Sequence, residues 1–249
     1  MLEETFSQFR KEFVIIAGPC AVESEEQLME IAKFISSRGI KFLRGGAFKP
    51  RTSPESFQGL GLKGLEILSK AKKEYGLKIV TEVLDTRDVD FVSEYADIIQ
   101  IGTRNMSNFA LLSEVGKTGK PILFKRGWGS TIDEWKKAAD YIRKEGNNKI
   151  IFCERGIRTF ETATRNTLDI SAVPIIQKET PFPIVVDPSH ASGRRDLIIS
   201  LCKAAKAVGA DGLIVEIHPN PEKALCDGKQ SLNFNEFDIL LKELTKINR

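Results

Sequence analysis

Six cationic side chains occupy positions that suit the binding of a multiply anionic small molecule. They follow several short apolar segments of the chain and are Arg44, Lys49, Arg51, Arg104, Lys125 and Arg155. Forked guanidinium groups and compact ammonium groups are the side chains that bind phosphate and carboxylate groups. The set therefore indicates a phosphate ester that also carries a carboxylate. The alternative for any one of these residues is an ion pair with an acidic neighbour, but this explains all six together less well.

A second set of residues has the chemistry of a metal site. It consists of Cys20, His190, Glu216 and Asp227. A thiolate, an imidazole and two carboxylates suit one divalent transition metal ion, such as Mn, Fe, Co or Zn. Each residue also has an ordinary alternative, because a cysteine is often a small buried hydrophobic residue and an acidic residue often caps a helix. The four are scattered along the chain, so their spacing alone does not decide between these interpretations.

Two further residues lie close to this set in the sequence. His218 would share the orientation of Glu216 only if the strand expected there continued that far. Cys226 adjoins Asp227, and we expect its thiol near that of Cys20, where oxidation could link the two.

The elements that must position these residues can be identified from short apolar runs rich in Ile, Val, Leu and Phe. Such runs are typical of strands buried on both faces of a parallel sheet. The expected strands are Val14–Ala17, Lys41–Leu43, Lys78–Thr81, Ile98–Ile101, Ile122–Phe124, Ile150–Phe152, Ile184–Val186 and Gly212–Val215.

Amphipathic segments follow each expected strand. One begins at Ser24, a good N-cap residue, and ends before Gly39. The others are expected at Lys63–Tyr75, Thr86–Tyr95, Asn108–Lys117, Thr131–Glu145, Thr164–Gln177, Arg194–Val208 and Asn235–Lys246. Strand and helix therefore alternate along the chain.

This alternation predicts the α/β class and a single (β/α)₈ TIM barrel. The length of 249 residues is close to that of such a barrel. An open nucleotide-binding sheet is less suitable, because the first strand leads into Gly18-Pro19-Cys20 without a glycine-rich GxGxxG turn. We expect residues 1–249 to form one catalytic domain, with residues 1–12 as a short N-terminal extension. Barrel active sites lie at the C-terminal ends of the strands, where both residue sets would meet.

The composition excludes several other classes of protein. Hydrophobic residues make up 41% and charged residues 29%, as in ordinary globular proteins. A net charge of +3 indicates neither a nucleic-acid-binding nor a membrane-binding surface. No apolar run reaches the length of a membrane span, and the N-terminus is acidic. The four cysteines are widely spaced without a CxxC pair, so we expect a reducing, cytoplasmic location.

Several motifs resemble those of 3-deoxy-D-arabino-heptulosonate 7-phosphate (DAHP) synthases, most closely the type Iβ enzymes. The motifs are Ile16-Ala-Gly-Pro-Cys20, Arg44-Gly-Gly-Ala-Phe-Lys-Pro-Arg-Thr-Ser53, Cys153-Glu-Arg-Gly156 and Asp187-Pro-Ser-His190. The resemblance extends from about Phe13 to Asn235. It implies a (β/α)₈ barrel and a transferase that condenses phosphoenolpyruvate, erythrose 4-phosphate and water to DAHP and phosphate. This aldol-type condensation is the first step of the shikimate pathway of aromatic amino acid biosynthesis.

The resemblance also implies residue roles. The metal ligands would be Cys20, His190, Glu216 and Asp227. The phosphoenolpyruvate site would be Arg44, Lys49, Arg104, Lys125 and Arg155, while Arg51 and Thr52 would bind erythrose 4-phosphate. Lys49, Lys125 and His190 are the expected catalytic residues, and Glu82, Glu154 and Asp187 match positions at the barrel mouth. Members of the family are commonly homodimers or homotetramers, and we expect the same here.

Three alternatives stay open at this point. The sister enzyme 3-deoxy-manno-octulosonate 8-phosphate synthase uses arabinose 5-phosphate, but it typically reads Lys-Ala-Asn-Arg-Ser-Ser where this chain reads Lys49-Pro-Arg-Thr-Ser53. Because this loop binds the aldose, erythrose 4-phosphate is favoured. Metal-independent relatives of that sister enzyme carry Asn at the position of Cys20, so the cysteine indicates a metal-requiring enzyme. The second alternative is a Schiff-base aldolase that uses Lys125. The third is a barrel that binds phosphosugars without catalysing a reaction.

Many DAHP synthases carry a regulatory extension, and we expect this chain to act as the catalytic barrel alone. Phenylalanine or tyrosine at millimolar concentration should then leave the rate of phosphate release unchanged. Strong inhibition by either amino acid in that assay would contradict the expectation.

Overall fold

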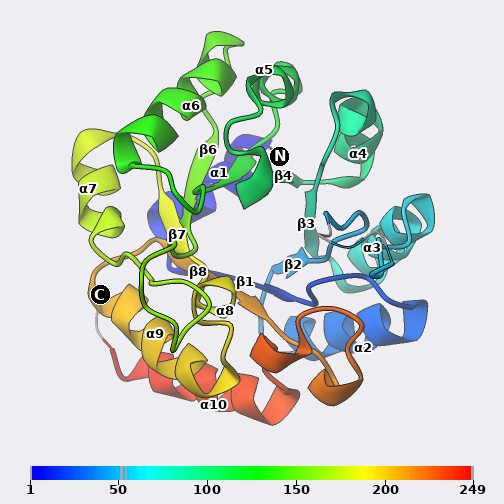
Figure 1. Cartoon of the computed structure of the whole chain (residues 1–249). Coiled ribbons are helices and arrows are strands. Elements are labelled where there is room, and N and C mark those ends of the chain that lie inside the picture. The colour runs from blue at the N-terminus through cyan, green and yellow to red at the C-terminus, as the bar shows by residue number, and fades with distance from the viewer. Residues whose placement is uncertain (1, 51–52, 54, 248–249) are drawn as a thin grey trace.

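The computed structural model describes residues 2–50, 53 and 55–247, and in it eight parallel strands form a closed barrel in chain order. The strands are β1 (Val14–Gly18), β2 (Phe42–Arg44), β3 (Lys78–Glu82), β4 (Ile98–Ile101), β5 (Ile122–Lys125), β6 (Ile150–Glu154), β7 (Ile184–Val186) and β8 (Gly212–Glu216). Pairing of β1 with β8 closes the barrel, with Val14 opposite Gly212. The helices surround it (Figure 1). The predicted (β/α)₈ TIM barrel is therefore confirmed.

The helices alternate with the strands as expected. They are α1 (Leu2–Lys11), α2 (Glu25–Ser36), α3 (Leu62–Tyr75), α4 (Val89–Tyr95), α5 (Phe109–Lys117), α6 (Ile132–Lys144), α7 (Ala172–Glu179), α8 (Pro188–Ser192), α9 (Arg195–Ala207) and α10 (Phe234–Thr245). Short 3₁₀ turns lie at Thr86–Asp88, Thr103–Asn105, Pro221–Lys223 and Gly228–Gln230. Across these described ranges, no helix is both long and apolar enough to cross a membrane.

The barrel has two apolar layers because successive side chains on a strand point to opposite faces. Inside the barrel lie Ile16, Phe42, Val80, Ile98, Leu123, Ile151, Cys153, Val185 and Ile214. The alternate residues, such as Leu43, Ile79 and Phe124, pack outward against the helices. Every strand is thus buried on both faces, which explains the continuous apolar runs seen in the sequence.

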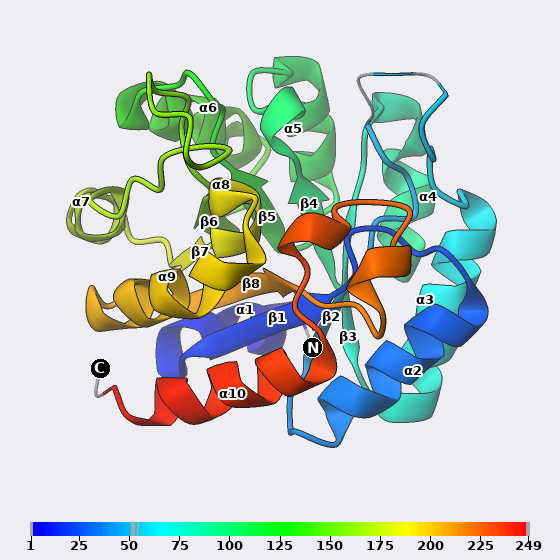
Figure 2. The ribbon, with the colours of Figure 1, turned by 60° about the horizontal axis from the view of Figure 1, so that its bottom comes forward.

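Helix α1 closes the N-terminal end of the barrel. Its Phe6 and Phe9 belong to the same apolar cluster as the inward-facing strand residues. Phe9 is fully buried, and its ring centroid lies 5.3 Å from that of Phe42. When the molecule is turned, the helix is seen below β6, β7 and β8 (Figure 2). The N-terminal extension therefore supplies part of the barrel core.

One predicted helix is wrong in its first half. The segment Thr164–Gln177 was expected to be helical, but α7 begins only at Ala172. The preceding residues form a loop in which Ile157 and Thr167 pair as an isolated antiparallel bridge. The backbone N–H groups of Arg165 and Asn166 donate to the carbonyl oxygens of Ser192 and Ala191. These bonds tie the loop to α8, a short helix that the sequence analysis did not predict.

Replacing Phe9 with alanine should lower the free energy of unfolding by about 3–5 kcal/mol, because it leaves a cavity at the closed end of the barrel. Urea denaturation followed by circular dichroism measures this change. Glu4→Ala, at an exposed position of the same helix, is the control and should change stability by less than about 0.5 kcal/mol. Equal stability of Phe9→Ala and the unmodified chain would contradict a core role for α1.

Candidate active site

A layer of polar residues lies inside the C-terminal end of the barrel. Its members each follow an inward-facing apolar residue by two positions, so strand alternation also points them inward. They are Arg44, Glu82, Gln100, Lys125, Arg155, Asp187 and Glu216, and all are buried. This layer lies beneath a cavity of about 290 Å³, lined by Arg44, Lys49, Pro50, Ser53, Ser56, Glu82, Gln100, Gly102, Thr103, Arg104, Lys125, Trp128, Arg155, Arg165, His190, Cys226 and Asp227.

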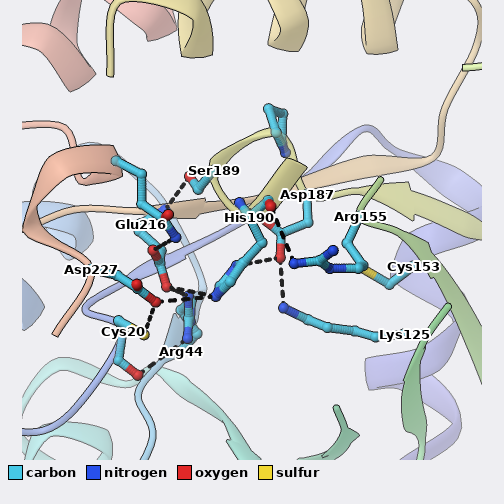
Figure 3. Close-up of polar contacts among 12 residues, drawn as sticks. Cys20, Arg44, Lys125, Cys153, Arg155, Asp187, Ser189, His190, Glu216 and Asp227 are labelled. Carbon is cyan, nitrogen blue, oxygen red and sulfur yellow. Dashed lines mark hydrogen bonds and ion pairs between the residues drawn. The ribbon is translucent and has the colours of Figure 1, made fainter. Parts of the chain in front are cut away.

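The predicted metal ligands converge at one side of this cavity. One ligand atom from each of Cys20, His190, Glu216 and Asp227 lies within 4.8 Å of those of the others. His190 Nε2 is 3.2 Å from Glu216 Oε1, and Cys20 Sγ is 3.1 Å from Asp227 Oδ2 (Figure 3). The donors come from the ends of β1 and β8, from α8, and from the loop after β8. This set of one sulfur, one nitrogen and carboxylate oxygens fits a divalent transition metal ion.

Asp187 fixes the orientation of His190. Its Oδ2 lies 2.7 Å from His190 Nδ1, and its Oδ1 accepts a hydrogen bond from the His190 backbone N–H at 3.0 Å. Because a carboxylate can only accept a hydrogen bond, Nδ1 carries the proton. Nε2 therefore directs its lone pair into the region where the other ligand atoms converge, as a metal ligand must. Burial lowers the pKa of His190 and outweighs the opposing effect of Asp187. The imidazole is therefore held in the neutral form that binds metal ions.

Asp187 also binds Lys125, whose Nζ lies 2.6 Å from Asp187 Oδ2. Burial alone would raise the pKa of Asp187, but His190 and Lys125 outweigh it and hold this pKa well below its ordinary value. Asp187 is therefore an anion that links a metal-ligand histidine to a lysine facing the cavity.

The cationic residues lie on two sides of the metal-ligand cluster. On one side Arg44 pairs with Glu216, with an N–O distance of 2.5 Å, and Lys49 Nζ lies 3.1 Å from Cys20 Sγ. On the other side of His190 lie Lys125 and Arg155 (Figure 3). Arg155 donates to the carbonyl oxygen of His190 at 3.1 Å. Positive charge thus flanks both sides of the imidazole.

The structure brings together the predicted cations Arg44, Lys49, Arg104, Lys125 and Arg155, all of which line the cavity. Arg51 and Thr52 lie outside the described residues, although Pro50 and Ser53 of the same loop line the cavity. The alternative of ion pairing with local acids holds for Arg44, which pairs with Glu216, and for Lys125, which pairs with Asp187.

Two other residues considered from the sequence, Glu154 and His218, lie outside the cavity and the metal-ligand cluster. Glu154 does not line the cavity, because it follows the inward-facing Cys153 by one residue and points to the opposite face. There it binds Arg126 at 3.0 Å and accepts the backbone N–H of Gly156. His218 lies outside the metal-ligand cluster, with Nε2 3.3 Å from Glu23.

Arg165 is a cavity residue that the sequence analysis missed. Its guanidinium lies 3.4 Å from Asp227 Oδ1 and 3.1 Å from the side-chain oxygen of Gln230. Gln230 in turn donates to Glu216 at 2.6 Å. Arg165 was overlooked because it falls in the segment expected to be helical. The scarcity of apolar residues between Thr159 and Asn166 is the signal that would have identified a loop.

The predicted proximity of Cys226 to Cys20 is confirmed, since their sulfur atoms are 3.3 Å apart. The two sulfur atoms are not joined by a disulfide bond, and disulfide formation between them stays a prediction. The hydrogen bond with Cys226 and burial together raise the pKa of Cys20 well above its ordinary value, while Lys49 opposes this.

Comparison with known proteins gives one consistent family. The model of the DAHP synthetase I family matches residues 9–249. A phospho-2-dehydro-3-deoxyheptonate aldolase of Thermotoga maritima is 64% identical over 94% of this chain and 70% of its own length. A 2-dehydro-3-deoxyphosphooctonate aldolase of Francisella tularensis is 35% identical over 94% of this chain and 92% of its own.

Solved structures show the same similarity. The crystal structure of the Thermotoga maritima phospho-2-dehydro-3-deoxyheptonate aldolase has a TM-score of 0.92 at 64% identity, covering 94% of this chain and 69% of that one. A truncated form of 3-deoxy-D-arabino-heptulosonate 7-phosphate synthase from the same organism has a TM-score of 0.88 at 60% identity, covering 94% and 86%.

Replacing Cys20 with alanine should reduce the affinity for Mn²⁺ or Zn²⁺ by at least about 100-fold, because it removes a direct ligand and not merely a supporting contact. The metal content after dialysis, measured by mass spectrometry, tests this, and circular dichroism checks that the fold is kept. Cys202→Ala removes a buried thiol of α9 outside the cluster and should keep the metal. Full metal content in Cys20→Ala would end the ligand assignment.

Proposed function

The chain belongs to the DAHP synthetase I family, and on that premise we propose that it is a metal-dependent DAHP synthase, the enzyme of the first step of the shikimate pathway. The reaction joins phosphoenolpyruvate, erythrose 4-phosphate and water and gives DAHP and inorganic phosphate. The observation that carries this proposal is the metal-ligand cluster of Cys20, His190, Glu216 and Asp227 beside a cation-lined cavity at the C-terminal end of the barrel.

We infer that these four residues hold one divalent metal ion, and Mn, Fe, Co and Zn all suit the donor set. When bound, such an ion supplies Lewis-acid polarisation of the aldehyde oxygen of the sugar phosphate. The chain itself contributes the orientation of the ligands. Asp187 sets the tautomer of His190, and Gln230 and Arg44 hold the two carboxylate oxygens of Glu216.

The cationic residues bind and align two anionic substrates. Lys125 and Arg155 lie on one side of His190, and with Arg104 they suit the phosphate of phosphoenolpyruvate. Arg44 and Lys49 complete the phosphoenolpyruvate site on the side of Cys20. Fixed positive charge offsets the mutual repulsion of the two substrates and keeps their reacting carbon atoms close. C3 of phosphoenolpyruvate can then attack the aldehyde carbon, and water adds to C2 before phosphate leaves.

The proposed reaction needs a proton-transfer group at each end of the new carbon–carbon bond. Lys49, 3.1 Å from Cys20 Sγ, lies on the side where the aldehyde oxygen becomes a hydroxyl group. Lys125, on the opposite side of His190, faces the region where water adds to C2. We assign proton transfer to these two lysines.

Erythrose 4-phosphate is the proposed acceptor in preference to arabinose 5-phosphate. The relative named for the heptulosonate reaction is 64% identical, whereas the relatives named for the octulosonate reaction are about 35% identical. The loop of Arg51 and Thr52, which suits binding of the sugar phosphate, contributes Pro50 and Ser53 to the cavity.

The other two functions are less well supported. A Schiff-base aldolase needs a lysine whose amine is available to attack a carbonyl group, but Nζ of the buried Lys125 is held in an ion pair with Asp187 at 2.6 Å. A phosphosugar-binding barrel without activity has no use for a cluster of one cysteine, one histidine and two carboxylates suited to a metal ion. We further propose a cytoplasmic homodimer or homotetramer, and a reducing compartment agrees with four cysteines that are not joined by disulfide bonds.

Phosphate release from phosphoenolpyruvate tests the proposed function. It should be fast with erythrose 4-phosphate and Mn²⁺, slow with arabinose 5-phosphate, and abolished by EDTA. A preference for arabinose 5-phosphate would move the chain to the sister activity. Activity that persists in EDTA, together with covalent trapping by borohydride, would instead support a Schiff-base mechanism.

A further inference from the structure

Trp128 lies where three arginine side chains from two other loops of the barrel mouth converge. It belongs to the loop between β5 and α6 and lines the cavity. The guanidinium carbon atoms of Arg104, Arg155 and Arg158 lie 5.1, 5.9 and 4.8 Å from the centre of its ring. All three distances are within the range of cation–π attraction, which is strongest for tryptophan.

The arrangement has a clear electrostatic consequence. Three guanidinium groups that surround one ring repel each other, and the negative face of the indole offsets part of this repulsion before any anion is bound. Arg104 follows β4, whereas Arg155 and Arg158 follow β6, so the indole connects the loops on both sides of its own strand. A backbone hydrogen bond of 2.8 Å from Arg158 N–H to the Trp128 carbonyl oxygen reinforces this link.

The second tryptophan shows that this environment is specific. Trp135 is fully buried in α6 and packs edge-on against Phe152, with ring centroids 4.7 Å apart. It therefore belongs to the core between the barrel and the helices. Trp128, in contrast, is partly exposed and faces the cavity. With two tryptophans in the chain, one reports on the core and the other on the site.

We propose that Trp128 is a positioning residue for the phosphate subsite of phosphoenolpyruvate, and that Arg158, which is exposed and lies outside the cavity lining on the far side of Arg155 in the sequence, adds positive charge beside that subsite. Trp128 holds the guanidinium groups of Arg104 and Arg155 toward the cavity and places Arg158 beside them. This inference rests on the proposed function for the identity of the substrate, but the geometry of the subsite depends only on the binding of a phosphate group.

Steady-state kinetics provides the first test. Trp128→Leu should raise the KM for phosphoenolpyruvate about five- to tenfold, with smaller changes in kcat and in the KM for erythrose 4-phosphate, because cation–π attractions of this kind are weak individually. Trp128→Phe keeps an aromatic face and should recover much of the loss. Phe160→Leu is the matched control, since Phe160 is exposed on the loop that carries Arg158 and does not line the cavity.

Tryptophan fluorescence of the metal-loaded protein provides a second test that does not need turnover. Phosphoenolpyruvate, and more weakly inorganic phosphate, should change the emission of the unmodified chain, because the bound anion neutralises part of the positive charge beside the indole ring. The change should be absent in Trp128→Phe, which retains Trp135. If Trp128 only packed against the loop and did not contact the phosphate-binding arginines, phosphate would leave its emission unchanged.

The role of Arg158 is tested in the same assays. Arg158→Gln should raise the KM for phosphoenolpyruvate about threefold or more, as expected for one lost cation near a phosphate. The control is Arg143→Gln, which removes a guanidinium that lies 5.8 Å from the Phe182 ring, away from the cavity.

The outcomes separate this inference from the proposed function. If the unmodified chain is active but Trp128→Leu keeps its KM for phosphoenolpyruvate, or if phosphate leaves the emission unchanged, Trp128 is not a positioning residue. If the chain shows no DAHP synthase turnover but phosphate still alters the emission of Trp128 alone, the phosphate subsite stands and the proposed reaction does not.

Discussion

The site depends on one constraint, which is that the charged side chains buried inside the C-terminal end of the barrel must be compensated by their neighbours. Removing an ionised group from water is strongly unfavourable unless an opposite charge and hydrogen bonds compensate for it. Strand alternation places arginine, lysine and carboxylate side chains in one inward-facing layer, directly above an apolar layer. Two pairs of opposite charge lie within this layer: Arg44 binds Glu216, and Lys125 binds Asp187.

This pairing also prepares the site for its proposed chemistry. Asp187 holds both Lys125 and His190, so the carboxylate that neutralises the lysine also sets the histidine tautomer. Glu216 is held by Arg44 and Gln230, which leaves it fixed beside His190 Nε2. The metal ligands and the substrate-facing cations are thus parts of one connected network. Preorganised groups of this kind need little rearrangement when charge develops during a reaction.

Most of the fold could be predicted from the sequence because strands buried on both faces appear as apolar runs, and Ile98–Ile101 and Ile184–Val186 match their strands in full. The strand ends then led to Cys20, His190, Glu216 and Asp227. Prediction failed where packing over long sequence distances decides the structure. The loop containing Arg165 is held by hydrogen bonds to α8. Glu154 follows the inward-facing Cys153 by one residue instead of two, so its side chain points away from the cavity and binds Arg126. The position of Trp128 among three arginines depends on loops that only the folded barrel brings together.

A crystal structure of the chain with Mn²⁺ and phosphoenolpyruvate tests the central claim most directly. The account predicts anomalous density for one ion coordinated by Cys20, His190, Glu216 and Asp227, with the phosphate group bound by Lys125 and Arg155 on the other side of the imidazole. An ion bound elsewhere, or a phosphate on the side of Cys20, would contradict the proposed division of the site.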